Sequence, residues 1–148
     1  MTFKPRTADR VYTKNQPKLG ADPEAYFGKK PVWRLGNMHM REPDDCGWHL
    51  LDGDKLNDVH LKLVDFERLT WREILVRDRH RNHAISVTKL VPSARKALGK
   101  TPFKDSDEVV SLRLSGAERV FGVMENEVFN VLWWDPDHNV CPAPKKHT

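Results

Sequence analysis

The fold is decided by the last third of the chain, where residues 108–136 read EVVSLRLSGAERVFGVMENEVFNVLWWDP. Strand-forming residues are concentrated in three runs separated by short turn segments: 108–114, 118–124 and 128–134. Ser115-Gly116 and Glu125-Asn126 suit the two tight turns, and Asp135-Pro136 ends the last run because proline cannot donate to a strand ladder. The stretch therefore predicts a three-stranded antiparallel meander.

The segment ahead of the meander predicts a strand followed by two helices. Alternating residues indicate a strand over 32–40, and a loop rich in aspartate and glycine follows it. Asp54 is the expected N-cap of a helix over 55–68, in which one helical face is apolar: Leu56, Val59, Leu63 and Phe66. A second helix is expected to start after Thr70, because Thr70 and Glu73 form a capping box.

Shorter elements fill the interval before the meander. A strand is expected over 84–87, and Ser93 is the expected cap of a brief helix over 94–98 that ends at Gly99. Helices grouped ahead of a terminal antiparallel sheet indicate an α+β fold, with two or three helices packed on one face of the C-terminal β-meander. The predicted organisation has three parts: a basic, proline-containing extended arm over 1–31, a single α+β domain over 32–140 and a basic C-terminal tail over 141–148.

Composition and charge narrow the class of protein. The 148 residues are 39% hydrophobic and 31% charged, which is typical of one globular domain. No apolar run is long enough to span a bilayer and the N-terminus lacks the apolar core of a signal peptide, so we expect a cytoplasmic protein without a membrane partner.

The net charge of +4 arises in the N-terminal arm, whose candidate anchors to the body are Tyr12, Tyr26 and Phe27. A basic arm attracts polyanions, and the alternative is a solvated tail. The arm and the C-terminal tail supply the basic residues predicted to bind nucleic acid: Lys4, Arg6, Arg10, Lys14, Lys18, Lys145 and Lys146.

Several catalytic signatures are absent from the sequence. It has no glycine-rich phosphate loop, no HExxH and no GxSxG, which argues against nucleotide-driven enzymes, zinc proteases and serine hydrolases. His80 and His83 have the spacing of metal ligands on a helix but lack convincing further ligands, so a polar connector is the favoured interpretation. Cys46 and Cys141 are far apart and outside any CxxC pair, and we predict no metal and no cofactor.

The residues best suited to chemistry lie at the end of the meander. Arg113 and Arg119 bracket a turn, and His138 lies just past the last strand. Guanidinium groups bind phosphate bidentately and histidine exchanges protons near neutral pH, as a metal-free ribonuclease requires. Under the alternative, the arginines form salt bridges with nearby glutamates and His138 caps a turn. The adjacent Trp133 and Trp134 are expected on opposite faces, with Trp134 as a surface on which a base stacks; core packing or a partner contact is the alternative.

The C-terminal pattern resembles the C-terminal half of the RelE/ParE-type toxin superfamily. The matching residues lie within 113–140: Gly116, Arg119, Gly122, Asp135, His138 and the aromatic-rich run 129–134. Two helices ahead of the meander are similar to that fold as well, whereas the arm, the loop over 41–53 and the insertion over 84–98 depart from it. The resemblance implies a small bacterial protein that pairs with an antitoxin and cleaves mRNA on the ribosome without a metal.

Two functions of different classes follow from these residues. The first is a toxin-like, metal-independent endoribonuclease in which Arg113 and Arg119 bind the phosphate and His138 is the general acid or base. The second is a non-catalytic regulatory module that binds protein or nucleic acid on the same scaffold. The expected partners are RNA, including ribosome-bound mRNA, and an antitoxin protein.

Overall fold

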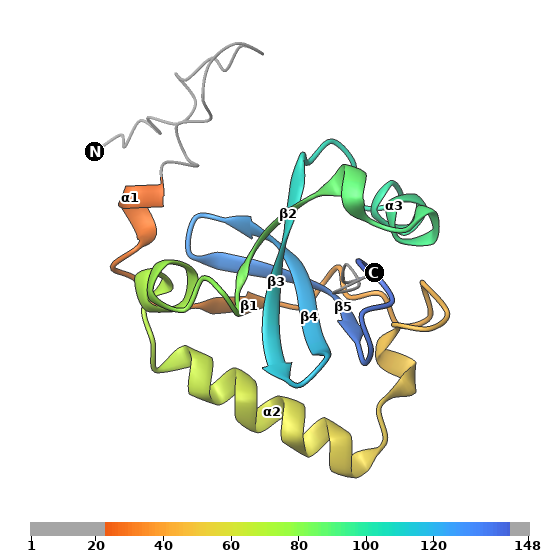
Figure 1. Cartoon of the computed structure of the whole chain (residues 1–148), viewed down its shortest axis with the longest axis horizontal. Helices are drawn as coiled ribbons and strands as arrows, with labels where there is room; N and C mark the ends of the chain where they lie inside the picture. The colour runs from red at the N-terminus through yellow and green to blue at the C-terminus, as the bar shows by residue number, and fades with distance from the viewer. Residues whose placement is uncertain (1–22, 143–148) are drawn as a thin grey trace, which may run out of the picture.

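The computed structural model describes residues 23–142 and confirms the α+β class (Figure 1). Its elements follow one another in this order: α1 (Pro23–Tyr26), β1 (Val32–Arg34), η3 (Trp48–Leu50), α2 (Gly53–Glu67), η4 (Glu73–Arg77), β2 (His83–Ser86), η5 (Val87–Lys89), α3 (Pro92–Leu98), β3 (Glu108–Ser115), β4 (Glu118–Glu125) and β5 (Val128–Asp135). The predicted meander is β3, β4 and β5, with each strand starting at the expected residue and ending one residue later.

The sheet has five strands in the order β1-β5-β4-β3-β2. β2 joins the meander by antiparallel pairing with β3, and β1 pairs with β5 in parallel at the opposite edge. Gly116 and Asn126 have φ values of 50° and 56° in the two hairpin turns, a conformation that glycine and asparagine tolerate.

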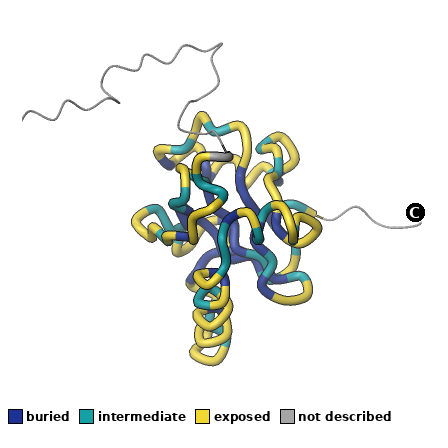
Figure 2. Tube along the Cα trace, turned by 90° about the vertical axis from the view of Figure 1, so that its left-hand side faces the viewer, coloured by how far each residue is buried: buried dark blue, intermediate teal, exposed yellow. Residues whose placement is uncertain are grey.

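The sheet is buried on both faces, which corrects the expectation that the helices pack on one face. A first core joins α2 and η4 to one face of the meander: Val59, Phe66, Trp71, Ile74, Val110, Leu112, Leu114 and Val120. A second core joins α3 to the other face: Ala94, Ala97, Leu98, Val109, Phe121 and Val123. Figure 1 shows α2 and α3 on opposite sides of the sheet, and Figure 2 shows the buried residues along the middle of the molecule. The cause is that both alternating sets of strand residues are apolar.

Several element boundaries differ from the prediction for local reasons. β1 ends at Arg34 because the chain turns next, with the Met38 N–H donating to the Leu35 carbonyl over 3.1 Å. Asp52, not Asp54, is the N-cap of α2, since its Oδ1 accepts the N–H of Lys55 at 2.8 Å.

The two helical segments that follow show one confirmed cap and one correction. Thr70 and Glu73 form the predicted capping box, but the segment that they start continues as the π-helical turn η4. α3 starts at Pro92 with Val91 as its N-cap, because proline suits the first helical position, and Ser93 does not cap it. Gly99 ends α3 with a φ of −63°, so its left-handed freedom is not used.

The part of the predicted arm that the structure describes contacts the body. Tyr26 and Phe27 pack against the first core, as expected of anchors. The carbonyls of Phe27 and Lys29 also accept the N–H groups of Arg72 and Trp71, each at 2.9 Å. Tyr12 and most residues predicted to bind nucleic acid lie outside the described residues: Lys4, Arg6, Arg10, Lys14, Lys18, Lys145 and Lys146.

The helices of residues 23–142 are all too short or too polar to cross a membrane.

Candidate functional site

Strand pairing brings the two predicted arginines together. Arg113 on β3 lies directly opposite Arg119 on β4, and Arg119 lies directly opposite Asp135 on β5. Their neighbours along the strands, Leu112 and Val120, belong to the first core. Because successive strand residues alternate between faces, the arginines and Asp135 project on the α3 side of the sheet.

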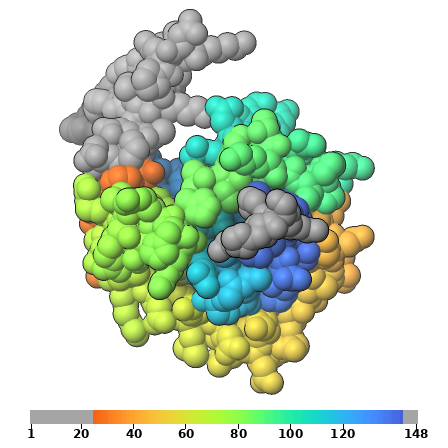
Figure 3. Space-filling model, in the orientation of Figure 1, coloured from red at the N-terminus to blue at the C-terminus, as the bar shows by residue number. Residues whose placement is uncertain are grey.

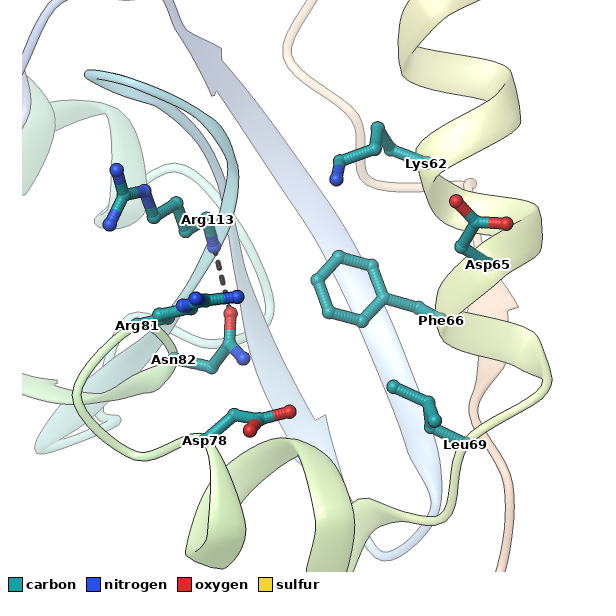
Figure 4. Close-up of a pocket in the computed structure, with 8 residues that line it drawn as sticks. All are labelled: Lys62, Asp65, Phe66, Leu69, Asp78, Arg81, Asn82 and Arg113. Atoms are coloured by element: carbon teal, nitrogen blue, oxygen red, sulfur yellow. Dashed lines mark hydrogen bonds between the residues drawn. The ribbon is translucent and has the colours of Figure 1, made fainter.

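The Arg113 side chain is directed away from α2, whereas its backbone N–H is directed to Asn82 (Figure 4). Its N–H donates to Oδ1 of Asn82 at 2.9 Å, and Nδ2 of Asn82 donates to the Ile74 carbonyl at 3.2 Å. Asn82, only 3% exposed, therefore ties η4 to the end of β3. Within residues 23–142 the Arg113 guanidinium forms no hydrogen bond and no ion pair.

The Arg119 side chain is held at the hairpin turn. Nη1 donates to the carbonyls of Gly116 and Glu118, at 2.6 and 3.0 Å. Burial lowers the pKa of the Arg119 guanidinium, as does the neighbouring positive charge of Arg113, whereas the negative charge of Asp135 acts in the opposite direction. The described carboxylates form no ion pair with either arginine. Two glutamates that the alternative pairs with the arginines form ion pairs with lysines instead: Glu118 with Lys55 and Glu127 with Lys29.

Asp135 organises the loop that carries His138. Its carboxylate is fully buried and accepts three backbone N–H groups, from Asp137 at 3.1 Å, Asn139 at 2.9 Å and Val140 at 2.8 Å. Val140 lies in the second core, so both ends of this short loop are fixed. His138 lies between them, partly exposed, with a φ of 59°. His138 is therefore held beyond the end of β5, on the loop that starts at Asp135, the residue opposite Arg119.

Trp133 and Trp134 do face opposite sides of the sheet, but both sides are core. Trp134 is 5% exposed and donates from Nε1 to Oε2 of Glu118 at 2.8 Å. Its ring therefore presents no outer surface on which a base stacks, because α2 and η4 cover that face. Trp133 is fully buried in the second core, where its Nε1 donates to Nδ1 of His39 at 2.6 Å.

The bond from Trp133 makes His39 sensitive to pH, since a protonated imidazole cannot accept it. Burial lowers the pKa of His39 below its ordinary value; Lys100 acts in the same direction and Glu42 opposes it. The folded chain therefore favours neutral His39 more strongly than the unfolded chain does. The contribution of neutral His39 to stability is complete above the unfolded pKa of about 6.5 and is lost as the pH falls through the folded pKa.

We expect the melting temperature to fall as the pH is lowered from 7.5 to 5, and we expect protonation of His39 to cause part of this fall. His39→Gln is the diagnostic variant, because an amide oxygen accepts the same hydrogen bond and does not titrate. Thermal melts of both chains across this range should show a shallower fall for His39→Gln. Parallel profiles for the two chains would contradict the role of His39.

His83 lies near the arginine pair, although the sequence analysis considered it only as part of a polar connector or as a metal ligand. It lies on β2 opposite Ser111, two residues from Arg113 along β3, and its side chain is exposed. Nothing in the sequence sets how β2 pairs with β3, so this proximity had no sequence signal. Within residues 23–142, no group of three His, Cys, Asp or Glu residues is placed to hold a metal ion.

A pocket of about 150 Å³ lies on the other side of the sheet, between α2 and the loop before β2 (Figure 4). Lys62 and Asp65 border it from α2 and Asp78 and Arg81 from the loop, with Phe66 at its apolar side. Arg113 also lines this pocket, although its side chain is directed away from α2.

Comparison of the chain with protein-family models, curated proteins and solved structures found no match. The resemblance to the RelE/ParE-type superfamily therefore rests on the sequence pattern.

Proposed function

We propose that the chain is a cytoplasmic, toxin-like endoribonuclease that cleaves RNA by metal-independent acid–base chemistry on the α3 side of the sheet. The observation that carries the proposal is that Arg113 and Arg119 lie directly opposite each other on neighbouring strands, and that no carboxylate of residues 23–142 forms an ion pair with either of them. Adjacent like charges repel, and an anion bound by both removes this repulsion. Guanidinium groups match the geometry of phosphate oxygens, so a phosphodiester suits the pair.

The proposed chemistry follows from what lies beside the pair. Arg113 and Arg119 bind the non-bridging phosphate oxygens and stabilise the negative charge that develops when the 2′-oxygen attacks phosphorus. His138 exchanges a proton with the attacking or the leaving oxygen. The products are a 2′,3′-cyclic phosphate and a free 5′-hydroxyl, and this step consumes no water and no metal.

The charge of the neighbouring segment supports RNA as the partner. Residues 77–100, which form the loop before β2 and continue through α3, contain a single carboxylate, Asp78. Seven basic side chains of the segment are exposed: Arg77, Arg79, Arg81, Lys89, Arg95, Lys96 and Lys100. Although Arg77 and Lys100 form ion pairs, the other cations favour contact with a phosphate backbone. The family resemblance adds ribosome-bound mRNA and an antitoxin protein as proposed partners.

Three single variants test the site: Arg113→Gln, Arg119→Gln and His138→Asn. We expect each to lower the rate of RNA cleavage by about 10²–10⁴-fold, because each removes phosphate binding or proton transfer. Asparagine is chosen at position 138 because it tolerates the positive φ of His138. The measurement is cleavage of a labelled RNA, free and ribosome-bound, in the presence of EDTA, together with growth arrest on expression in bacteria.

Two controls make the result specific to the site. Arg68→Ala removes an arginine that is 74% exposed at the end of α2, on the other side of the sheet, and should leave cleavage unchanged. An RNA with 2′-deoxyribose at the cleaved position should resist the wild-type chain. Full cleavage by a folded Arg119→Gln/His138→Asn double variant would refute the site. RNA binding without cleavage by the wild-type chain would instead favour the non-catalytic binding module.

A further inference from the structure

The proposed reaction needs two proton-transfer groups, and His138 supplies one. A base must take the proton from the 2′-hydroxyl while an acid protonates the leaving 5′-oxygen. A second titratable side chain should therefore flank the arginine pair on the side away from His138. That side is β2, because the sheet order places β3 between β2 and β4.

His83 is the side chain that β2 offers at this position. Ile85, two residues further along β2, packs against the second core, so His83 projects on the same α3 side as the arginines. Its partner Ser111 is two residues from Arg113, and such diagonal neighbours lie about 7–8 Å apart. The His83 side chain is exposed and therefore accessible to a substrate.

The four groups follow one another across the sheet: His83 on β2, Arg113 on β3, Arg119 on β4 and His138 on the loop after β5. Neighbouring strands are about 4.8 Å apart, so β2 and β5 are separated by about 14 Å. Two imidazoles that reach inward from this separation can contact one phosphodiester held by the arginines between them. Figure 3 shows the surfaces of β2 (green), the β3–β4 hairpin (light blue) and the segment after β5 (dark blue) near one another on one face.

The surroundings of His83 are cationic or neutral. Arg113 and Ser111 flank it from β3, and Arg81 and His80 precede it on its own segment. Asp78 is the carboxylate of that loop, and its oxygens bind Arg77. Within residues 23–142 no carboxylate forms an ion pair with His83, so its imidazole is not committed to a structural partner.

We propose that His83 is the second proton-transfer residue of the site, a role that rests on the proposed ribonuclease function. One imidazole, neutral, takes the proton of the 2′-hydroxyl as the 2′-oxygen bonds to phosphorus. The bond from phosphorus to the 5′-oxygen breaks, and the other imidazole, protonated, gives its proton to that oxygen. His83 and His138 exchange protonation states in each transfer, and reversal of both steps with water as nucleophile opens the cyclic phosphate.

The test is the pH dependence of RNA cleavage by the full chain. The wild-type chain should give a bell-shaped profile, because one imidazole must be neutral and the other protonated. We expect His83→Gln to reduce the maximal rate by about 10²–10⁴-fold and to remove one limb of the bell, and His138→Asn to remove the other. The matched control is His80→Gln, which removes an exposed histidine three residues away and should preserve rate and profile.

The outcomes separate this inference from the proposed function. Wild-type cleavage with an unchanged rate and bell in His83→Gln overturns the role of His83 and leaves the ribonuclease proposal standing. Absence of cleavage by the wild-type chain overturns both. An independent measurement follows the imidazole protons by NMR: inorganic phosphate bound at the arginine pair should shift the imidazole resonances of His83 in the wild-type chain. This change should disappear in Arg113→Gln, and its absence in the wild-type chain overturns the placement of His83 beside the phosphate.

Discussion

Asp135→Ala is expected to lower the free energy of unfolding by about 3–5 kcal/mol, a large share of the stability of a domain of this size. The carboxylate is fully buried and accepts three backbone N–H groups, which alanine would leave without an acceptor. The Val140 N–H is buried and those of Asp137 and Asn139 are partly buried, and a buried donor left unpaired costs about 1–3 kcal/mol. Urea denaturation of the two chains measures the difference through the shift of the unfolding midpoint at constant slope.

Asp137→Ala is the matched control for this variant. Asp137 is exposed in the same loop, and its replacement should change stability by no more than about 0.5 kcal/mol. Asp135→Asn should fall between the two, because its amide retains one acceptor oxygen. A loss below about 1 kcal/mol for Asp135→Ala would show that the loop holds its conformation without the carboxylate, and His138 would then not depend on it.

The meander was predictable from the sequence because local signals coincide there. Strand-forming residues fill each run, while glycine and asparagine stand at the two positions where the turns need positive φ. The capping box of Thr70 and Glu73 was predictable for the same reason, since its two hydrogen bonds connect residues three apart. Local hydrogen bonds and local steric preferences are encoded within a few residues.

The arrangement of the helices was not predictable, because it depends on contacts between distant segments. Both faces of the meander are apolar, and the sequence alone did not show that α3 covers the face opposite α2. Trp134 illustrates the consequence, since a residue expected on an outer face lies beneath α2 and η4. The choice between Asp52 and Asp54 as the cap of α2 depended on backbone geometry, as both aspartates satisfy the sequence rule.

The candidate site likewise contains features that were predictable from the sequence and features that were not. The proximity of Arg113 and Arg119 follows from a tight hairpin and was inferred from their positions around the turn. His83 joins them only through the pairing of β2 with β3, and Asp135 faces Arg119 only because of an irregularity in the β4–β5 ladder. The pairing shifts by one residue between Phe121 and Gly122, which brings Leu132 and Trp133 together into the second core. Without this shift, Arg119 would pair with the preceding residue, Trp134, and Asp135 would project on the opposite face.

Gly122→Ala is therefore expected to be among the most damaging single substitutions in the chain, with a loss of about 3–5 kcal/mol. A Cβ at this position would meet the Asn130 carbonyl oxygen and would lie 2.5 Å from Cε2 of the buried Phe129 ring. Neither group can move freely, because one belongs to the paired strand β5 and the other to the first core. The expected readout is a large drop in the urea midpoint or recovery of the variant in the insoluble fraction.

Gly36→Ala is the control for this substitution, since a Cβ there meets no atom within 4 Å and the change should cost less than about 0.5 kcal/mol. Gly122 also affects the site, because the β4–β5 irregularity beside it sets Asp135 opposite Arg119. A Gly122→Ala chain that remains folded by relaxing this irregularity should lose RNA cleavage together with its native pairing. A variant as stable and as active as the wild-type chain would show that the close approach of β4 and β5 at Gly122 is not required by the fold.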